Sequence, residues 1–205
     1  PLQEGQLESG VIKKGNWRGG LFAEKNYKAG EPISALVLPA ELSEREIIYK
    51  AIHEVKGMLG EAKITPGYES SVEISHHYGL RNFFQIGAFI ITCINKEYCK
   101  KLIVLLPGQI HPYHYHKKKE ETFQVLSGVL KVNIEGGERV IYPGDLLLMP
   151  RGVWHAFSSE KGAIFEEIST TSFVDDSFYA DKNINKMAKN ERKTELIGWG
   201  RHQFI

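Results

Sequence analysis

Frequent switching between short apolar runs and turn signals constrains the fold of this chain more than any other feature. The turn signals are pairs such as Pro107-Gly108 and Gly136-Gly137, which favour tight reversals of the chain. Many short strands separated by turns at this frequency predict an all-β sandwich or barrel. The predicted strands cover residues 71–75, 83–94, 101–106, 121–126, 129–134, 140–141, 145–149 and 163–169.

One helix is predicted before these strands. Ser43 opens an S-x-x-E capping box, and apolar residues recur at helical spacing from Ile47 to Leu59. Gly57 and Gly60 are expected to weaken the helix and then to end it. The expected division is an N-terminal β-rich segment over 1–40, a helix and linker over 41–61, and a barrel with a polar C-terminal tail over 62–205.

Composition narrows the class of protein. A hydrophobic fraction of 42% and a charged fraction of 25% over 205 residues are ordinary for a globular protein with one core and appendages. The net charge of +1 gives no support to nucleic-acid binding. No apolar stretch approaches the roughly 20 residues of a membrane span. We therefore expect neither nucleic acid nor membrane as a partner.

Two cysteines and the first residue bear on the setting of the chain. Cys93 and Cys99 are separated by five residues, which fits neither a CxxC redox motif nor a zinc knuckle. Two reduced thiols in or beside a strand are the expected state, and a reducing cytoplasm agrees with it. Because the sequence starts at Pro1 rather than Met, we expect a segment of a longer polypeptide or a processed chain.

Four side chains between residues 114 and 155 have the types and spacing of a metal site. Successive side chains of a strand alternate faces, so His114 and His116 project to one side and can offer two imidazole nitrogens to one ion. Glu121 begins the next extended run after a short polar turn, and His155 follows the tight turn at 150–152. Three nitrogens and one carboxylate oxygen suit one divalent ion of Mn, Fe, Co, Ni or Zn, with positions left for substrate.

The glycines around these side chains add to the pattern, since an isolated HxH is more often an ordinary pair of histidines. The first segment reads G-x5-HxH-x4-E-x6-G from residue 108, and the second reads G-x5-P-x-G-x2-H from residue 144. Together they resemble the two signature motifs of the cupins over residues 108–159, with Ser159 where that family usually has Asn. The resemblance implies a cupin jelly-roll β-barrel with the metal near the middle of its lumen.

A narrower resemblance points to chemistry. Lys119 completes an HxHxxKxE pattern, and the later Glu-Glu-Ile-Ser-Thr strand is followed by an acidic pair, as in the D-lyxose isomerase branch of the cupins. On that resemblance Glu167 matches the acid/base glutamate, Lys119 the lysine that orients the sugar oxygens, and Asp176 a substrate-contacting acid. The alternatives are that Lys119 belongs to a solvated basic turn and that Glu166, rather than its neighbour, faces the lumen.

The expected chemistry agrees with this assignment. An aldose–ketose isomerisation removes a proton from the carbon next to a carbonyl, and the ene-diolate that forms needs positive charge beside its oxygens. A carboxylate in a mostly apolar barrel is expected to have a raised pKa, which suits a general base. His111 is a candidate substrate contact at the barrel mouth, with a plain surface position as the alternative. For His76-His77 a structural role is expected, because adjacent strand residues face opposite ways.

A broader resemblance concerns the biological setting. Segments 75–80, 95–102, 106–109 and 166–170 look like the C-terminal cupin extension of N-acetylneuraminate synthase-type proteins, and residues 17–31 look like the start of their antifreeze-like domain. This resemblance implies a role in sialic-acid-type carbohydrate synthesis, on a sugar or keto-sugar acid. The synthase's own catalytic barrel is absent from the sequence, so condensation activity is not expected.

The leading expectation is a metal-dependent sugar isomerase or epimerase that binds a small-molecule sugar. Two other functions stay open at this point: a non-catalytic metal- and sugar-binding cupin module of a synthase, and a metal-dependent oxygenase. A homodimer is expected by analogy with other cupins, with the N-terminal strands supplying the pairing.

Overall fold

The computed structural model describes residues 42–67 and 70–199. The β-rich segment expected over residues 1–40 therefore lies outside the described residues. Two compact units are distinguished, Pro1–Ser43 and Glu44–Ile205, and the second unit carries every helix and strand described below. No helix in the described ranges is long and apolar enough to cross a membrane.

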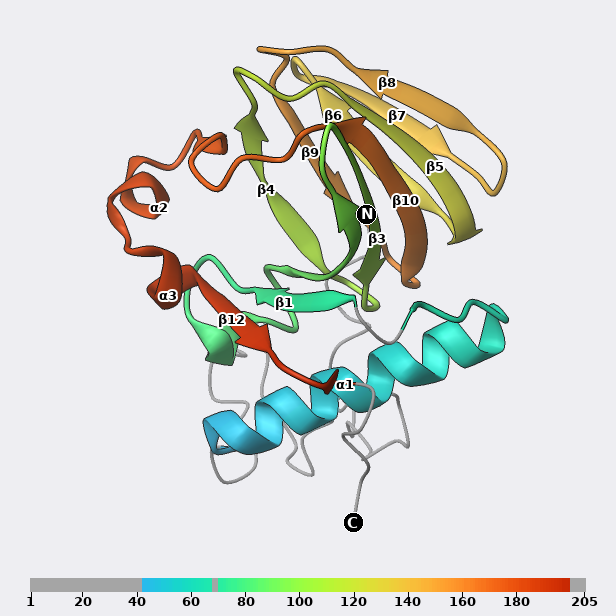
Figure 1. Cartoon of the computed structure of the whole chain (residues 1–205), viewed down its shortest axis with the longest axis vertical. Coiled ribbons are helices and arrows are strands. Elements are labelled where there is room, and N and C mark those ends of the chain that lie inside the picture. The colour runs from blue at the N-terminus through green and yellow to red at the C-terminus, as the bar shows by residue number, and fades with distance from the viewer. Residues whose placement is uncertain (1–41, 68–69, 200–205) are drawn as a thin grey trace, which may run out of the picture. The chain divides into compact units, whose positions relative to one another are not determined.

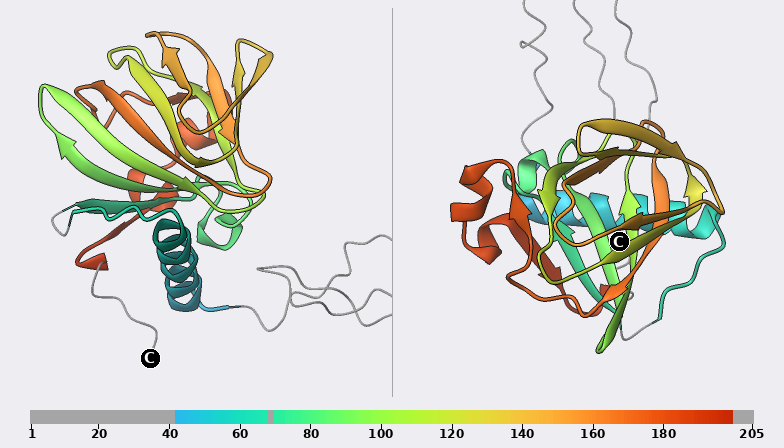
Figure 2. Two further views of the ribbon diagram at one scale, coloured as in Figure 1. Left: turned by 90° about the vertical axis from the view of Figure 1, so that its right-hand side faces the viewer. Right: turned by 90° about the horizontal axis from the view of Figure 1, so that it is seen from above.

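Two antiparallel sheets form the barrel (Figure 1). The larger sheet has the strand order β12-β1-β2-β3-β10-β5-β8, and the smaller has the order β11-β4-β9-β6-β7. Figure 2 shows the strands curving around a common interior. This is the all-β jelly-roll architecture that the sequence predicts. The strands are β1 (Ser71–Ser75), β2 (Ala88–Asn95), β3 (Tyr98–Leu105), β4 (Ile110–Tyr115), β5 (Glu121–Gly128), β6 (Leu130–Ile134), β7 (Gly137–Ile141), β8 (Leu146–Met149), β9 (His155–Ser158), β10 (Ala163–Thr170), β11 (Phe178–Tyr179) and β12 (Lys193–Leu196).

Helix α1 (Glu44–Glu61) lies against the larger sheet. Its buried residues, among them Ile47, Ala51 and Val55, recur at helical spacing and share one core with Val72 and Ile74 of β1. The helix continues through Gly57 and ends at Glu61, one residue after the Gly60 at which the sequence predicts its end. Packing of the apolar face outweighs the glycine's low helix propensity.

A second core fills the inside of the barrel. Three aromatic rings form its centre, with centroids 5.1 Å apart for Phe123 and Phe165, 5.2 Å for Phe157 and Phe165, and 5.8 Å for Phe123 and Phe157. Such edge-to-face contacts are the favoured geometry for aromatic pairs. This apolar layer forms a wall beside the polar part of the lumen described below.

The C-terminal segment closes one side of the barrel (Figure 1). It leaves β10 and forms β11, which pairs with β4 so that Tyr179 lies opposite His114. Two short helices, α2 (Lys182–Lys186) and α3 (Lys189–Arg192), lead to β12, which pairs with β1. The sequence predicts a weakly helical or irregular tail here. It does not predict the pairing of β11 with β4 or of β12 with β1.

Strand positions follow the prediction closely where apolar alternation is strong. The first predicted strand coincides with β1, and the predicted ranges for β5, β6, β8 and β10 differ by one or two residues at their ends. The run at 83–94 is partly wrong, because a 3-10 turn, η2 (Leu80–Asn82), and an irregular stretch precede β2. The two cysteines are free, with Cys93 exposed and Cys99 buried in β3.

Candidate metal centre and active site

Three histidines converge inside the barrel from two neighbouring strands. His114 lies on β4 directly opposite His155, the first residue of β9, and His116 follows the end of β4. All three side chains are buried. One ring nitrogen from each lies within 4.8 Å of the corresponding atoms of the other two, which is close enough for a single ion to contact all three.

Backbone carbonyls fix the orientation of each ring. When one imidazole nitrogen donates to a carbonyl, the other nitrogen keeps its lone pair for an ion, so these contacts select the tautomer that a metal site needs. The Nδ1 atoms lie 2.8 Å from the Pro112 oxygen for His114, 3.0 Å from the Val153 oxygen for His155, and 2.5 Å from the Asp176 oxygen for His116.

Glu121 brings a carboxylate to the free Nε2 atoms. Its Oε1 lies 3.4 Å from His116 Nε2, and its Oε2 lies 3.2 Å from His155 Nε2. Within the described chain, Glu121 Oε2 and His155 Nε2 have no hydrogen-bond partner. Because the proton of the His155 ring is on Nδ1, where it is donated to the Val153 oxygen, Nε2 and the carboxylate oxygen present lone pairs to each other. A cation between them would satisfy both atoms, so the four residues fit a divalent ion.

The electrostatics of the cluster also suit an ion. Burial holds the pKa of His114 and of His116 below the usual range, so both imidazoles are neutral at physiological pH. Burial alone would raise the pKa of Glu121, but the positive charge of Lys119 holds it well below its ordinary value. Neutral imidazoles beside an ionised carboxylate are the protonation states in which these groups bind metal.

A second charged cluster lies beside the first. Glu167 Oε1 is 2.8 Å from Lys119 Nζ and 3.0 Å from Lys101 Nζ, and all three side chains are largely withdrawn from solvent. Lys119 also contacts the Glu121 carboxylate. It is 4% exposed, so the alternative of a solvated basic turn does not apply to it. Glu166 faces outward, where its carboxylate pairs with the exposed Lys100.

The pKa expected for Glu167 is wrong in direction. Burial alone would raise it, as the sequence argument supposed, but the two positive charges of Lys101 and Lys119 hold it below its ordinary value. The sequence argument missed Lys101. This residue lies opposite Glu167 in the pairing of β3 with β10, and no local motif marks it.

Asp176 organises the turn between the first two ligands and Glu121. Its carboxylate accepts the backbone N–H groups of Lys117, Lys118 and Lys119 at 2.9–3.0 Å, while its carbonyl oxygen receives His116 Nδ1. One residue therefore positions both a candidate ligand and the buried lysine. A substrate contact by this carboxylate stays a prediction, and in the structure its oxygens are directed at the turn.

His111 lies inside the barrel, so the alternative of a plain surface position is wrong. It is 5% exposed and stacks on Phe157 at 4.5 Å between ring centroids. Its ring also meets those of His77 and His114 edge-on, each at 4.7 Å. The Nε2 atom of His77 lies 2.9 Å from the Tyr179 hydroxyl, so this ring nitrogen has a hydrogen-bond partner inside the barrel.

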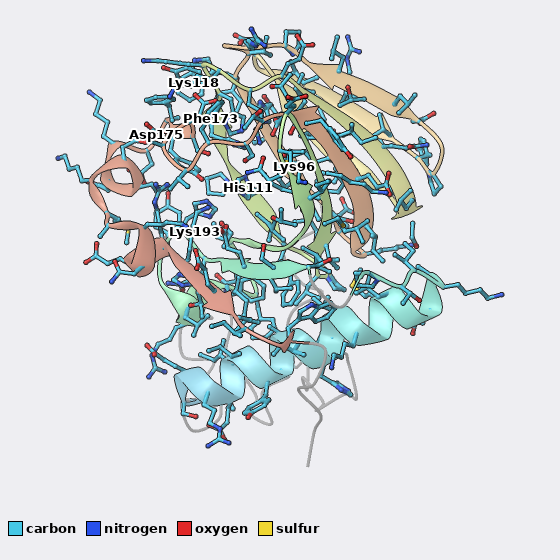
Figure 3. The ribbon with its side chains drawn as sticks, viewed as in Figure 1. Lys96, His111, Lys118, Phe173, Asp175 and Lys193 are labelled. Carbon is cyan, nitrogen blue, oxygen red and sulfur yellow. The ribbon has the colours of Figure 1, made fainter. Side chains whose placement is uncertain are left out.

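A cavity of about 160 Å³ joins these groups. One part of its wall carries three of the four candidate ligands, His114, His116 and Glu121, with the Lys101–Glu167–Lys119 cluster. Another part carries residues from β1, β11 and β12. At the mouth lie Phe173 and Val174, which are 44% and 71% exposed. Figure 3 shows Phe173 grouped with Lys118 and Asp175 near the top of the barrel. The residues from the second part of the wall are Glu73, Ser75, Tyr179 and Lys193.

Residues 101–168 match the cupin domain family. The barrel is a cupin fold. In solved structures, the L-ribose isomerase of Geodermatophilus obscurus is similar over 71% of this chain and 96% of its own, with a TM-score of 0.59 at 16% identity. The L-ribose isomerase of Cellulomonas parahominis, in a complex with L-psicose, has a TM-score of 0.58 over 73% of this chain and 97% of its own, also at 16% identity. At this identity the likeness shows the shared fold alone.

Two relatives are similar in sequence over most of this chain. A D-lyxose ketol-isomerase of Thermofilum sp. is 26% identical over 174 residues, which is 70% of this chain and 96% of the relative. A D-lyxose/D-mannose isomerase of Thermosediminibacter oceani is 26% identical over 176 residues, which is 72% of this chain and 94% of the relative. The similarity therefore covers more of the chain than the cupin motifs alone.

Proposed function

We propose that this cupin is a metal-dependent aldose–ketose isomerase of a small sugar. The observation that carries the proposal is the buried Lys101–Glu167–Lys119 cluster directly beside the Glu121 carboxylate and the three imidazoles. A carboxylate flanked by two ammonium groups matches the needs of a proton transfer next to a carbonyl. The relatives named as D-lyxose and D-mannose isomerases support the same reaction class.

In this mechanism Glu167 is the base. Its ionised carboxylate takes the proton from the carbon next to the carbonyl and returns it to the neighbouring carbon, while the hydroxyl proton passes between the two sugar oxygens. Lys119 and Lys101 donate to the oxygens on which negative charge develops. As the lysines turn from the carboxylate toward these oxygens, the basicity of Glu167 increases.

His114, His116, Glu121 and His155 would hold the divalent ion, which when bound supplies Lewis-acid polarisation of the sugar carbonyl. Mn, Zn, Fe, Co and Ni all accept this donor set. Asp176 holds the His116 ring and the Lys119 backbone in place. A sialic-acid-type pathway, a keto-sugar acid as substrate, a homodimer and a cytoplasmic location stay predictions from the sequence.

Deuterium incorporation tests the proposal. The metal-loaded protein is incubated in deuterated water with a panel of aldoses and ketoses that includes D-lyxose and D-mannose, and carbon-bound deuterium is followed by NMR. The parent should exchange and isomerise at least one sugar, and Glu167→Gln should lower the rate by about 10²–10⁴-fold. Glu166→Gln, the same change on the outward face of β10, should keep the parent rate.

Three outcomes would contradict the proposal. Saturable sugar binding without exchange would identify a non-catalytic binding module. Oxygen uptake by the ferrous protein without exchange would identify an oxygenase. Undiminished exchange by Glu167→Gln with metal bound would remove the assigned base.

A further inference from the structure

The wall of the cavity formed by β1, β11 and β12 has chemistry of its own. Glu73 of β1 and Lys193 of β12 form an ion pair with Nζ–oxygen distances of 2.8 and 3.0 Å, so both carboxylate oxygens contact one ammonium group. Their side chains are 19% and 20% exposed. Figure 3 shows Lys193 beside β12 and close to His111. Both residues lie outside the segment that matches the cupin domain.

Strand alternation directs this pair into the cavity. On β1, Val72 and Ile74 pack into the core shared with α1, whereas Glu73 and Ser75 line the cavity. Across the larger sheet, Glu73 is paired with Ile90 of β2, so two further strand steps lead to β10 and its Glu167. The pair therefore occupies a different part of the wall from the proposed base.

Tyr179 completes this part of the wall. Its hydroxyl lies 2.9 Å from His77 Nε2. Its ring stacks on the ring of His114, with 5.5 Å between the two centroids. A ligand that reaches from the proposed base to the Glu73–Lys193 pair would therefore meet a hydroxyl held in place by a buried histidine.

The charge balance of the cavity limits which ligand fits. Each of the four lysines that line it is ion-paired within the described chain: Lys101 and Lys119 with Glu167, Lys189 with Glu195, and Lys193 with Glu73. A sugar hydroxyl can donate to the Glu73 carboxylate and accept from Lys193. A terminal carboxylate or phosphate of the ligand would be repelled by the negative charge of Glu73. The lysines that could bind such an anion are already neutralised by their ion-pair partners.

We propose that Glu73 and Lys193, with Tyr179, form the subsite for the far end of the sugar, and that this subsite selects a neutral, hydroxyl-bearing end over an anionic one. The proposal deepens the isomerase function and rests on it for the identity of the ligand as a sugar. It separates the two substrate classes that the sequence resemblances leave open, and it favours the neutral sugar over the keto-sugar acid.

Direct binding tests the subsite with a measurement other than the isomerisation rate. The probes are D-mannose, D-mannuronate and D-mannose 6-phosphate, which differ only at the far end of the chain and are titrated calorimetrically into the metal-loaded protein. The parent should bind D-mannose at least about tenfold more tightly than either anion. Glu73→Gln frees Lys193 from its partner, so the ratio should move toward the anions by about tenfold or more.

Two further variants make the outcome decisive. Lys193→Met leaves Glu73 unpaired and should weaken D-mannose and both anions, the anions more strongly. Glu160→Gln makes the same carboxylate-to-amide change in an exposed ion pair with Lys131, away from the cavity, and should leave every ratio unchanged. Circular dichroism verifies that each variant is folded.

Equal or tighter binding of an anion by the parent would overturn the proposal, and so would an unchanged ratio in folded Glu73→Gln protein. If the deuterium experiment finds no turnover while these ratios behave as expected, the subsite stands and the isomerase assignment fails. If turnover occurs without the expected selectivity, the isomerase assignment stands and the subsite proposal fails.

Discussion

The three candidate histidine ligands are oriented by backbone carbonyls rather than by other side chains. Each imidazole gives Nδ1 to a carbonyl oxygen, and two of these carbonyls lie two residues before the histidine that they orient. Local chain geometry therefore aims the rings, so the arrangement tolerates changes in most neighbouring side chains. The third ring, of His116, depends instead on Asp176, which is 60 residues away in sequence.

Glu167 should make stability depend on pH. Because its pKa in the folded protein lies below the ordinary value of 4.5, its ionised form stabilises the fold above that pH, and the contribution is lost as pH falls below it. In metal-free protein at pH 7, Glu167→Gln should lower the free energy of unfolding by about 3–5 kcal/mol, because Lys101 loses its ion-pair partner and the buried Lys119 keeps only Glu121.

The difference in unfolding free energy between the parent and Glu167→Gln should shrink as pH falls from about 5 toward 3. Urea denaturation at several pH values measures it. Glu166→Gln, which breaks only the half-exposed pair with Lys100, should cost about 0–1 kcal/mol. A deficit in Glu167→Gln that stays constant over this range would contradict the assigned ionisation.

At the scale of single elements, a close contact between two turns of the barrel requires glycine at one position. Gly128 ends β5 with φ at +79°, and a Cβ atom there would lie 2.2 Å from the Gly162 carbonyl oxygen. Gly162 precedes β10, so this contact joins the ends of two paired strands. The glycine is required both by its backbone conformation and by the closeness of another main chain.

Gly128→Ala should therefore lower the free energy of unfolding by about 3–5 kcal/mol, since strain and a backbone clash act together. Gly144→Ala is the matched control: its φ is +95°, but nothing lies within 4 Å of the added carbon. It should cost about 1–2 kcal/mol from backbone strain alone. Urea denaturation of both variants compares them, and equal losses would show that the clash is relieved at little cost.

How well the elements could be predicted depended on whether their signal was local. The alternation of β1 and β5 and the HxH spacing are contained within a few residues, so they could be interpreted directly. Lys101 and Glu167 are 66 residues apart, and Glu73 and Lys193 are 120 apart, so only the pairing of strands brings them together. The polar residues of β12 carry no apolar alternation, and the sequence therefore did not predict that strand.

For the whole molecule, ion binding should be linked to folding because the proposed ligands come from β4, β5 and β9. An ion at about 100 times its Kd should add about 2.7 kcal/mol to the free energy of unfolding. For a domain of this size the Tm should rise by about 5–10 °C over chelator-treated protein.

Differential scanning calorimetry with Mn²⁺, Co²⁺, Ni²⁺ and Zn²⁺ measures this rise. His114→Ala should abolish most of it, whereas His53→Ala, at an exposed position on α1, should keep it. An equal rise in both variants would place the ion elsewhere.

The closure of the pocket by β1 and the C-terminal segment also has an evolutionary consequence. The candidate ligands and proposed base lie between residues 101 and 168, while the proposed subsite for the far end of the sugar comes from strands on either side of that segment. Selection for a new sugar can thus act on mutations in the flanking strands while the reaction centre is inherited unchanged. Recombination that exchanges only these flanks among cupins would shuffle substrate preference without rebuilding catalysis.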